Sequence, residues 1–188
     1  TACRFLLETG PSHRLSAQLE ARALDMVVAA EMEGPREGLE THALLSEPFI
    51  AVWPEGRVGA DLPLLHYSQR TLMGRQIAAH LAREGRLPPH RFEIDSYPAI
   101  LALVAAGQGW SILTPSGVRH GARAGVALAP LPGAALTRRI VLSARAGMMG
   151  KLPAEVAGRL RALLAERIVA PALAEAPWLE GMLKVEGA

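Results

Sequence analysis

Residues 95–115 read Asp-Ser-Tyr-Pro-Ala-Ile-Leu-Ala-Leu-Val-Ala-Ala-Gly-Gln-Gly-Trp-Ser-Ile-Leu-Thr-Pro, and this stretch decides the expected fold. Asp95 or Ser96 can cap a helix, because a side-chain oxygen there accepts from the free N–H groups of the first turn. The helix is predicted to end at Gly107, and residues 110–113 then form a short, apolar strand. A helix leading into a buried strand is the unit from which α/β proteins are built.

Similar units are expected on both sides of this stretch. Half of the 188 residues are apolar and only 4% are aromatic, which favours helices packed on a sheet over an aromatic-rich barrel. The run 25–30 is continuously apolar, the pattern of a parallel strand covered on both faces. Strands are expected over 3–8, 25–30, 44–53, 64–67, 91–94, 126–129 and 139–143, and helices over 13–22, 71–86 and 153–169, the last ended by Pro171. The predicted fold class is therefore α/β.

Composition excludes several classes of protein. A net charge of +2 is too small for a chain that neutralises many phosphates, so nucleic-acid binding by these residues is not expected. There is no apolar window long enough for a membrane span. One cysteine, Cys3, cannot form an internal disulfide, and a reduced cytoplasm is the simpler expectation. The chain begins on an apolar, strand-like run with no basic leader, which suggests a fragment whose start lies upstream.

Charge is unevenly distributed along the chain. Residues 1–56 carry 4 basic and 9 acidic side chains, residues 57–145 carry 11 and 4, and residues 146–188 carry 5 of each. A basic middle between acidic and neutral ends suggests two lobes and an anionic ligand. The alternative is that the arginines only coat solvated helices.

Hydroxyl groups follow four of the expected strands. In parallel α/β sheets the carboxyl ends of the strands and the amino ends of the following helices face one crevice, where free N–H groups favour anions. The alternative is that these residues merely cap helices. The hydroxyl-bearing candidate ligand residues are Thr9, Ser12, Ser68, Thr71, Ser96, Tyr97 and Thr114. Arg70 is a further candidate, because its guanidinium could bind an acidic effector through two hydrogen bonds.

Patterns for catalysis and cofactor binding are weak. Ser111 follows half of a nucleophile elbow but falls within a buried strand, so we interpret it as a core residue. The sequence Gly107-Gln108-Gly109 lacks a third glycine and precedes a strand, so no dinucleotide or phosphate loop is predicted. The six histidines contain no pair four residues apart and have no cysteine beside them, which argues against a metal site. No cofactor and no enzymatic activity are expected.

Four stretches, in order, resemble the effector-binding domain of LysR-type transcriptional regulators. The sharpest is 95–115, which is similar to that family's helix, Gly-x-Gly and apolar strand ended by proline. The others are 8–28, with its Gly turn, helix and Leu-Asp-apolar strand, then 47–54 and 138–142. The resemblance covers residues 3–170.

The resemblance implies two Rossmann-like lobes of the type 2 periplasmic-binding-protein kind, joined by two crossover segments. Lobe I would comprise residues 1–53 and 145–188, and lobe II residues 54–144. The turns that bind the ligand in this family then coincide with the candidate ligand-binding residues named above. A small effector would bind between the lobes. A further strand and helix would precede residue 3, and operator DNA would be bound only by a helix-turn-helix domain outside this sequence.

The resemblance also implies a homodimer or tetramer. The expected partner-facing helix is 71–86, with Leu72, Met73 and Ile77 as candidate interface residues. The alternative function is that of a solute-binding protein of a transporter, which shares this fold. A third class, a hydrolase, would need a nucleophile with a nearby base, and the sequence places none at a strand end.

Overall fold

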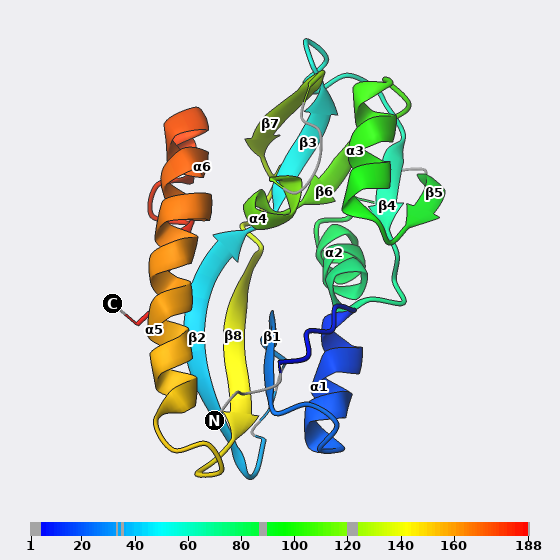
Figure 1. Cartoon of the computed structure of the whole chain (residues 1–188). Helices are drawn as coiled ribbons and strands as arrows, with labels where there is room; N and C mark the ends of the chain where they lie inside the picture. Colours follow the sequence, from blue (N-terminus) through cyan, green and yellow to red (C-terminus); the bar gives the residue numbers. More distant parts are fainter. Residues whose placement is uncertain (1–4, 33, 35, 87–89, 120–123, 188) are drawn as a thin grey trace.

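A computed structural model describes residues 5–32, 34, 36–86, 90–119 and 124–187. Within these residues the strands form three sheets, arranged with helices on their sides (Figure 1). The mixed α/β fold class predicted from the sequence is confirmed.

The first sheet has the order β1-β8-β2-β9, and all of its pairings are antiparallel. Its strands are β1 (Met26–Ala30), β8 (Thr137–Arg145), β2 (Leu39–Pro48) and β9 (Lys184–Val185). Helix α1 (Ser12–Glu20) lies against β1, and α5 (Leu152–Leu164) packs against β2 on the other side (Figure 1).

The second sheet has the order β6-β3-β7 and is also antiparallel. Its strands are β6 (Ser111–Leu113), β3 (Ile50–Pro54) and β7 (Val126–Pro130). The third sheet pairs β4 (Leu64–Tyr67) with β5 (His90–Ile94) in parallel, and a parallel bridge from Leu64 to Trp110 places it beside β6. Helices α2 (Leu72–Arg83), α3 (Tyr97–Ala105) and α4 (Pro115–Val118) accompany these two sheets.

Local signals explain why the helices begin where they do. Thr71 caps α2 by accepting from the Gly74 N–H at 3.0 Å, and Ser96 caps α3 by accepting from the Ala99 N–H at 3.4 Å. Pro98 lies in the first turn of α3, where its missing N–H costs nothing.

The single strand expected over 44–53 is wrong, because the chain forms two strands there. β2 ends at Pro48 and β3 begins at Ile50 in a different sheet. Between them the Phe49 N–H donates to the Leu136 carbonyl at 2.8 Å, and its side chain is 2% exposed. Pro48 has no N–H to donate to a ladder, which suits the end of a strand. The residues from Ile50 onward pair with β6 and β7, and this pairing places β3 in the second sheet.

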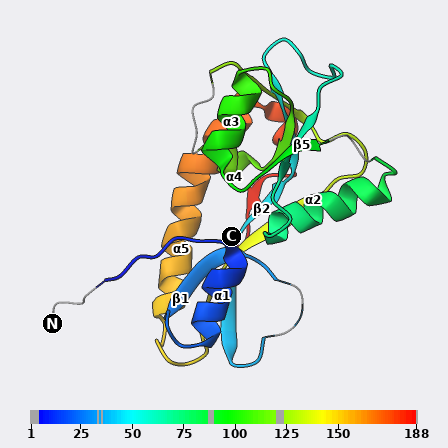
Figure 2. The same cartoon turned by 90° about the vertical axis from the view of Figure 1, so that its right-hand side faces the viewer.

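The expected strand over 3–8 is also wrong where the structure describes it. Residues 5–10 form neither helix nor strand, and Phe5, Leu6 and Leu7 are about three-quarters exposed. In Figure 2 this segment extends away from the fold. A strand needs a partner ladder, and the one described neighbour of β1 is the antiparallel β8. Accordingly β1 is not the doubly covered parallel strand that its apolar run suggested.

The last helix does not end at Pro171. After α5 the helix continues through a π-helical turn, η1 (Ala165–Val169), into α6 (Ala170–Glu175), and a 3₁₀ turn, η2 (Pro177–Leu179), follows. A π-helical turn shifts the helical hydrogen bonds by one residue. The helix can therefore continue past Pro171, which has no N–H to donate.

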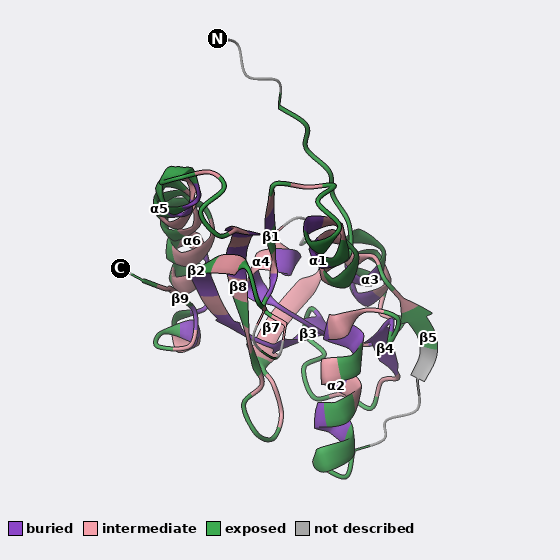
Figure 3. Cartoon of the chain, turned by 90° about the horizontal axis from the view of Figure 1, so that it is seen from below, coloured by how far each residue is buried: buried purple, intermediate pink, exposed green. Residues whose placement is uncertain are grey.

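The main core gathers residues from the second and third sheets, the helices beside them and the C-terminal segment. It includes Phe49, Ile77, Ile100 and Leu113, together with Leu179 after α6. A smaller cluster of Leu44, Leu142 and Ala157 lies between the first sheet and α5. Figure 3 shows buried stretches along the central strands, whereas much of α1 is exposed. Among the described residues, no helix has the length and apolar character that a bilayer span requires.

Candidate functional site

Two of the predicted ligand residues come together where the first and second sheets meet. Thr114 follows β6 and is fully buried, and Tyr97 is the first residue of α3. The Tyr97 Oη and Thr114 Oγ1 atoms lie 3.2 Å apart. Tyr97 also donates to the Met73 Sδ at 3.0 Å. A phenol has one proton to donate, so in this arrangement the Thr114 hydroxyl donates to the Tyr97 oxygen.

Arg138, at the start of β8, completes this chain of hydrogen bonds. Its Nη2 donates to Thr114 Oγ1 at 2.9 Å, and its Nη1 lies 3.5 Å from the Met73 Sδ. Tyr97 and Arg138, at the two ends of this series of hydrogen bonds, therefore both donate to the Met73 sulfur. A thioether sulfur is a weak acceptor.

A buried carboxylate neutralises Arg138. Glu47 at the end of β2 is 0% exposed, and its Oε1 accepts from Arg138 Nε at 2.9 Å and Nη2 at 2.8 Å. Ser116 donates to the same carboxylate through its N–H at 3.0 Å and its Oγ at 2.8 Å. Burial alone would lower the pKa of the Arg138 guanidinium, but Tyr97 and Glu47 together raise it. Arg138 and Glu47 therefore form a charged pair.

We call Glu47, Met73, Tyr97, Thr114, Ser116 and Arg138 the junction cluster. Glu47 and Arg138 are paired residues of the first sheet, at the two points where the chain passes between sheets. Thr114 and Ser116 flank the start of α4, beside the second sheet. The junction cluster thus ties the two sheets together by side-chain hydrogen bonds.

The turn at Ser68 holds a carboxylate from the protein itself. Glu93 Oε1 accepts from Ser68 Oγ at 2.9 Å and from the Gln69 N–H at 2.6 Å. These two bonds lower the pKa of Glu93. Arg70 donates through its Nε to Ser68 Oγ at 3.4 Å. The Ser68 hydroxyl, which the sequence analysis predicted as a donor to a ligand, therefore donates to Glu93 instead.

Tyr67 connects this turn to the junction cluster. Its ring lies 5.3 Å from that of Tyr97, and its hydroxyl donates to the Asp95 carbonyl at 3.1 Å. The other predicted residues have local roles: Thr71 and Ser96 cap helices, and Ser12 Oγ accepts from the Ala30 N–H at 3.2 Å. Thr9 is exposed before α1.

Arg138 and Glu47 were missed in the sequence because neither lies in a hydroxyl-bearing turn. The signal was present in another form, since each is a charged residue inside or next to an apolar strand run. Charged residues are rarely fully buried unless they are paired. Two such residues of opposite charge are therefore candidate partners in an ion pair.

The family model described as "LysR substrate binding domain" matches residues 2–176 of this chain. The chain belongs to the LysR substrate-binding domain family. This confirms the effector-sensing regulatory domain that the sequence resemblance implied, with its periplasmic-binding-protein-like fold. A comparison with curated proteins found no match.

Solved structures of LysR-type regulatory domains share this fold. The Corynebacterium glutamicum OxyR C206 mutant is 24% identical with a TM-score of 0.70, covering 88% of this chain and 56% of that one. The HypT regulatory domain from Salmonella typhimurium is 18% identical with a TM-score of 0.69, covering 87% and 83%. The CcmR regulatory domain of Synechocystis PCC6803 in complex with 2-PG is 18% identical with a TM-score of 0.67, covering 81% and 79%. The chain spans little more than half of the OxyR protein.

Two of the three expected partner-facing residues of this LysR-type domain are buried within the chain itself. Met73 is 6% exposed and Ile77 is 1% exposed, and both belong to the main core. The apolar side of α2 faces the sheets, so these two residues are corrected to core residues. Leu72 is partly exposed and stays a candidate.

Ser111 lies in the core of this LysR-type domain, as its place in an apolar strand suggested. It is 0% exposed, and its Oγ donates to the Leu65 carbonyl at 2.7 Å. In the part of the chain that the structure describes, no group of three metal-ligating side chains is found.

Replacing Tyr67 by Phe is expected to change how stability depends on alkaline pH. Burial, together with Tyr97, raises the pKa of Tyr67 to about 12. In the unfolded chain a tyrosine titrates near pH 10, so the unfolded state loses this proton first and folding stability falls as pH rises from about 10 to about 12. Urea unfolding at about pH 9 and about pH 11 should show a steeper loss for the native chain than for Tyr67→Phe. Equal losses would show that burial does not hold this proton.

Proposed function

We propose that this domain binds a small effector at the junction cluster and that binding changes the arrangement of the two lobes. The observation that carries the proposal is the chain of donors from Arg138 through Thr114 and Tyr97 to the Met73 sulfur. An oxygen acceptor on a ligand would be a better partner for these donors than a thioether. Effector contacts with both lobes would favour the arrangement in which both are made.

The two-lobe division follows the sheets in this proposal. The chain passes from the first sheet to the second between Pro48 and Ile50, and returns between Pro130 and Thr137. These crossings differ from the boundaries 53/54 and 144/145 expected from the sequence. β3 therefore lies in lobe II and β8 in lobe I. The candidate residues Thr9, Ser12 and Ser96 remain predicted effector contacts.

The rest of the regulator is also a proposal. The full protein would repress or activate transcription through a helix-turn-helix domain outside these residues, as a homodimer or tetramer in the cytoplasm. Among the similar structures, a Corynebacterium glutamicum OxyR C206S mutant is H₂O₂-bound and the CcmR domain is in complex with 2-PG. At 24% identity or less these likenesses show the fold, and they do not carry either ligand to this chain. The findings give no support to the transporter alternative.

An anionic effector remains our prediction, supported by the basic residues 57–145. A thermal-shift screen with matched carboxylates and carboxamides tests it, because a ligand that binds only the folded state raises Tm. The carboxylates are expected to give the larger shifts. Larger shifts from the carboxamides would contradict the prediction, because they would show that a negative charge on the ligand does not favour binding.

Thr114→Val is expected to weaken binding of the best compound from that screen about tenfold. The change keeps the side-chain shape but removes the hydroxyl that accepts from Arg138 and donates to Tyr97, so neither residue is held in place to donate to a ligand oxygen. A tenfold loss of affinity corresponds to about 1.4 kcal/mol. Isothermal titration calorimetry measures the affinity. Thr137→Val is the control, because Thr137 is exposed and lies next to Arg138 in the chain. Unchanged affinity in Thr114→Val would remove the junction cluster from the binding site.

A further inference from the structure

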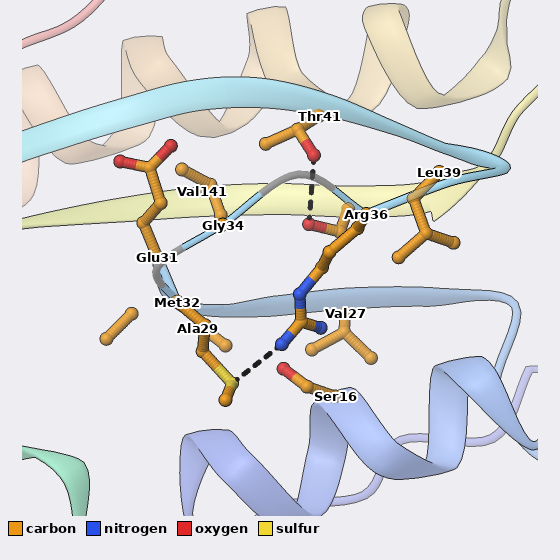
Figure 4. A pocket seen from close by; sticks show the side chains of 12 residues that line it. Ser16, Val27, Ala29, Glu31, Met32, Gly34, Arg36, Leu39, Thr41 and Val141 are labelled. Atoms are coloured by element: carbon orange, nitrogen blue, oxygen red, sulfur yellow. Dashed lines mark hydrogen bonds between the residues drawn. The ribbon is translucent and has the colours of Figure 1, made fainter.

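A pocket of about 240 Å³ lies on the first sheet, beside α1 (Figure 4). None of its lining residues belongs to the junction cluster. Its floor is formed by Val27 and Ala29 of β1 and by Val141 of β8, which are apolar. The same face carries a pair of hydroxyls, Thr41 and Ser143, whose oxygens lie 3.4 Å apart on the neighbouring strands β2 and β8.

Arg36 reaches into this pocket toward α1 (Figure 4). Its Nη1 pairs with Glu20 Oε1 at 3.1 Å, and its Nη2 donates to the Met32 Sδ at 2.9 Å. The Glu20 side chain is 56% exposed, so water and salt screen this ion pair strongly. A thioether is a weak acceptor for a charged donor. An oxygen acceptor beside Arg36 Nη2 would therefore make a stronger hydrogen bond than the Met32 sulfur does.

Among the described residues that line the pocket, the other charged group is Glu31, and it already has a partner. Glu31, which lines one side, pairs with Arg139 at 3.2 Å, and both side chains are nearly half exposed. Arg36 thus differs from Glu31, because within the described part of the chain its Nη2 donates only to the Met32 sulfur. The charge and the hydroxyl pair lie at opposite sides of an apolar floor, an arrangement that suits a molecule with one acceptor group and a compact apolar body.

The volume limits the size of such a molecule. A dry apolar cavity of about 150 Å³ holds a benzene molecule, and pockets for drug-sized ligands begin at about 300 Å³. A pocket between these limits fits one ring or a short branched chain with a single polar group.

We propose that this pocket is a second small-molecule site, which binds a carboxylate with a compact apolar body. The carboxylate takes the place of the Met32 sulfur as the acceptor for Arg36 Nη2. The apolar body covers Val27, Ala29 and Val141. This site is distinct from the junction cluster, because the two share no residue.

Cyclohexanecarboxylate is the probe, and cyclohexanecarboxamide is its neutral match. Titration of the ¹⁵N-labelled domain by NMR should give saturable shifts of the amide signals of Ala29, Val141 and Ser143 with the carboxylate. The carboxamide should bind at least tenfold more weakly. Absence of saturable shifts at these residues, or shifts confined to Tyr97 and Thr114, would overturn the proposal.

Three variants locate the interaction. Arg36→Gln should weaken carboxylate binding at least tenfold and leave carboxamide binding nearly unchanged. Ala29→Leu should fill the floor and abolish binding of both compounds, which keeps the test valid if Arg36→Gln does not fold. Arg167→Gln, at a residue 73% exposed on η1, is the control and should bind like the native domain. Native affinity in both Arg36→Gln and Ala29→Leu would overturn the site.

Discussion

Arg138→Met is expected to lower the free energy of unfolding by about 3–5 kcal/mol, the usual cost of leaving one partner of a buried ion pair unmatched. Glu47 is 0% exposed, so water cannot replace the two guanidinium contacts that it loses. The two bonds from Ser116 remain, but they are weaker than a charged partner. Urea denaturation monitored by the tryptophan fluorescence measures the change.

The neighbouring residue provides the control for that experiment. Arg139 pairs with Glu31 at 3.2 Å, but the two side chains are 48% and 42% exposed. Arg139→Met is therefore expected to cost no more than about 1 kcal/mol. The double variant Glu47→Leu/Arg138→Met should recover most of the stability, because it removes both buried charges together. If Arg138→Met and Arg139→Met were equally mild, the pair at the junction would not be the tie between the sheets that we describe.

Gly74→Ala is expected to destabilise the domain by about 3 kcal/mol, at the upper end of the cost of overpacking. A Cβ on Gly74 would meet the carbonyl of Ser68, which is backbone and cannot rotate away. Helix α2 would have to move from the end of β4, and Met73, the residue before Gly74, would move with it. The same urea denaturation gives the stability change.

Gly158→Ala is the matched control. It makes the same substitution inside α5, where nothing lies within 4 Å of the added Cβ. Alanine has the higher helix propensity, so this variant should be more stable by up to about 1 kcal/mol. Two substitutions of one kind with opposite signs would show that the close approach of α2 to the Ser68 turn, and not glycine content, sets the result.

Elements with local signals could be predicted from the sequence, and the structure confirms them. The strand predicted over 64–67 forms there, and the helix predicted over 71–86 forms over Leu72–Arg83. Ser96 caps α3, as its hydroxyl indicated. The division of 44–53 into two strands could not be predicted in this way. It depends on which distant strands pair with each half: β8 with the first, and β6 and β7 with the second.

The candidate site shows the same division. Tyr97 and Thr114 were predicted because both follow strands and carry hydroxyls. The positions of Glu47 and Arg138 depend on pairing across 91 residues of sequence, which no local pattern contains. For the same reason, nothing near Ser68 in the sequence indicates that the carboxylate of Glu93 lies against it.

A crystal structure of the Arg36→Gln variant with the compound that raises its Tm most would test the account most directly, because this variant lacks the guanidinium proposed to bind carboxylates in the second pocket. We predict that the compound lies between Tyr97, Thr114 and Arg138, with an oxygen accepting from Arg138 or Tyr97 in place of the Met73 sulfur. A compound bound elsewhere, with the hydrogen bonds of the junction cluster unchanged, would contradict the account.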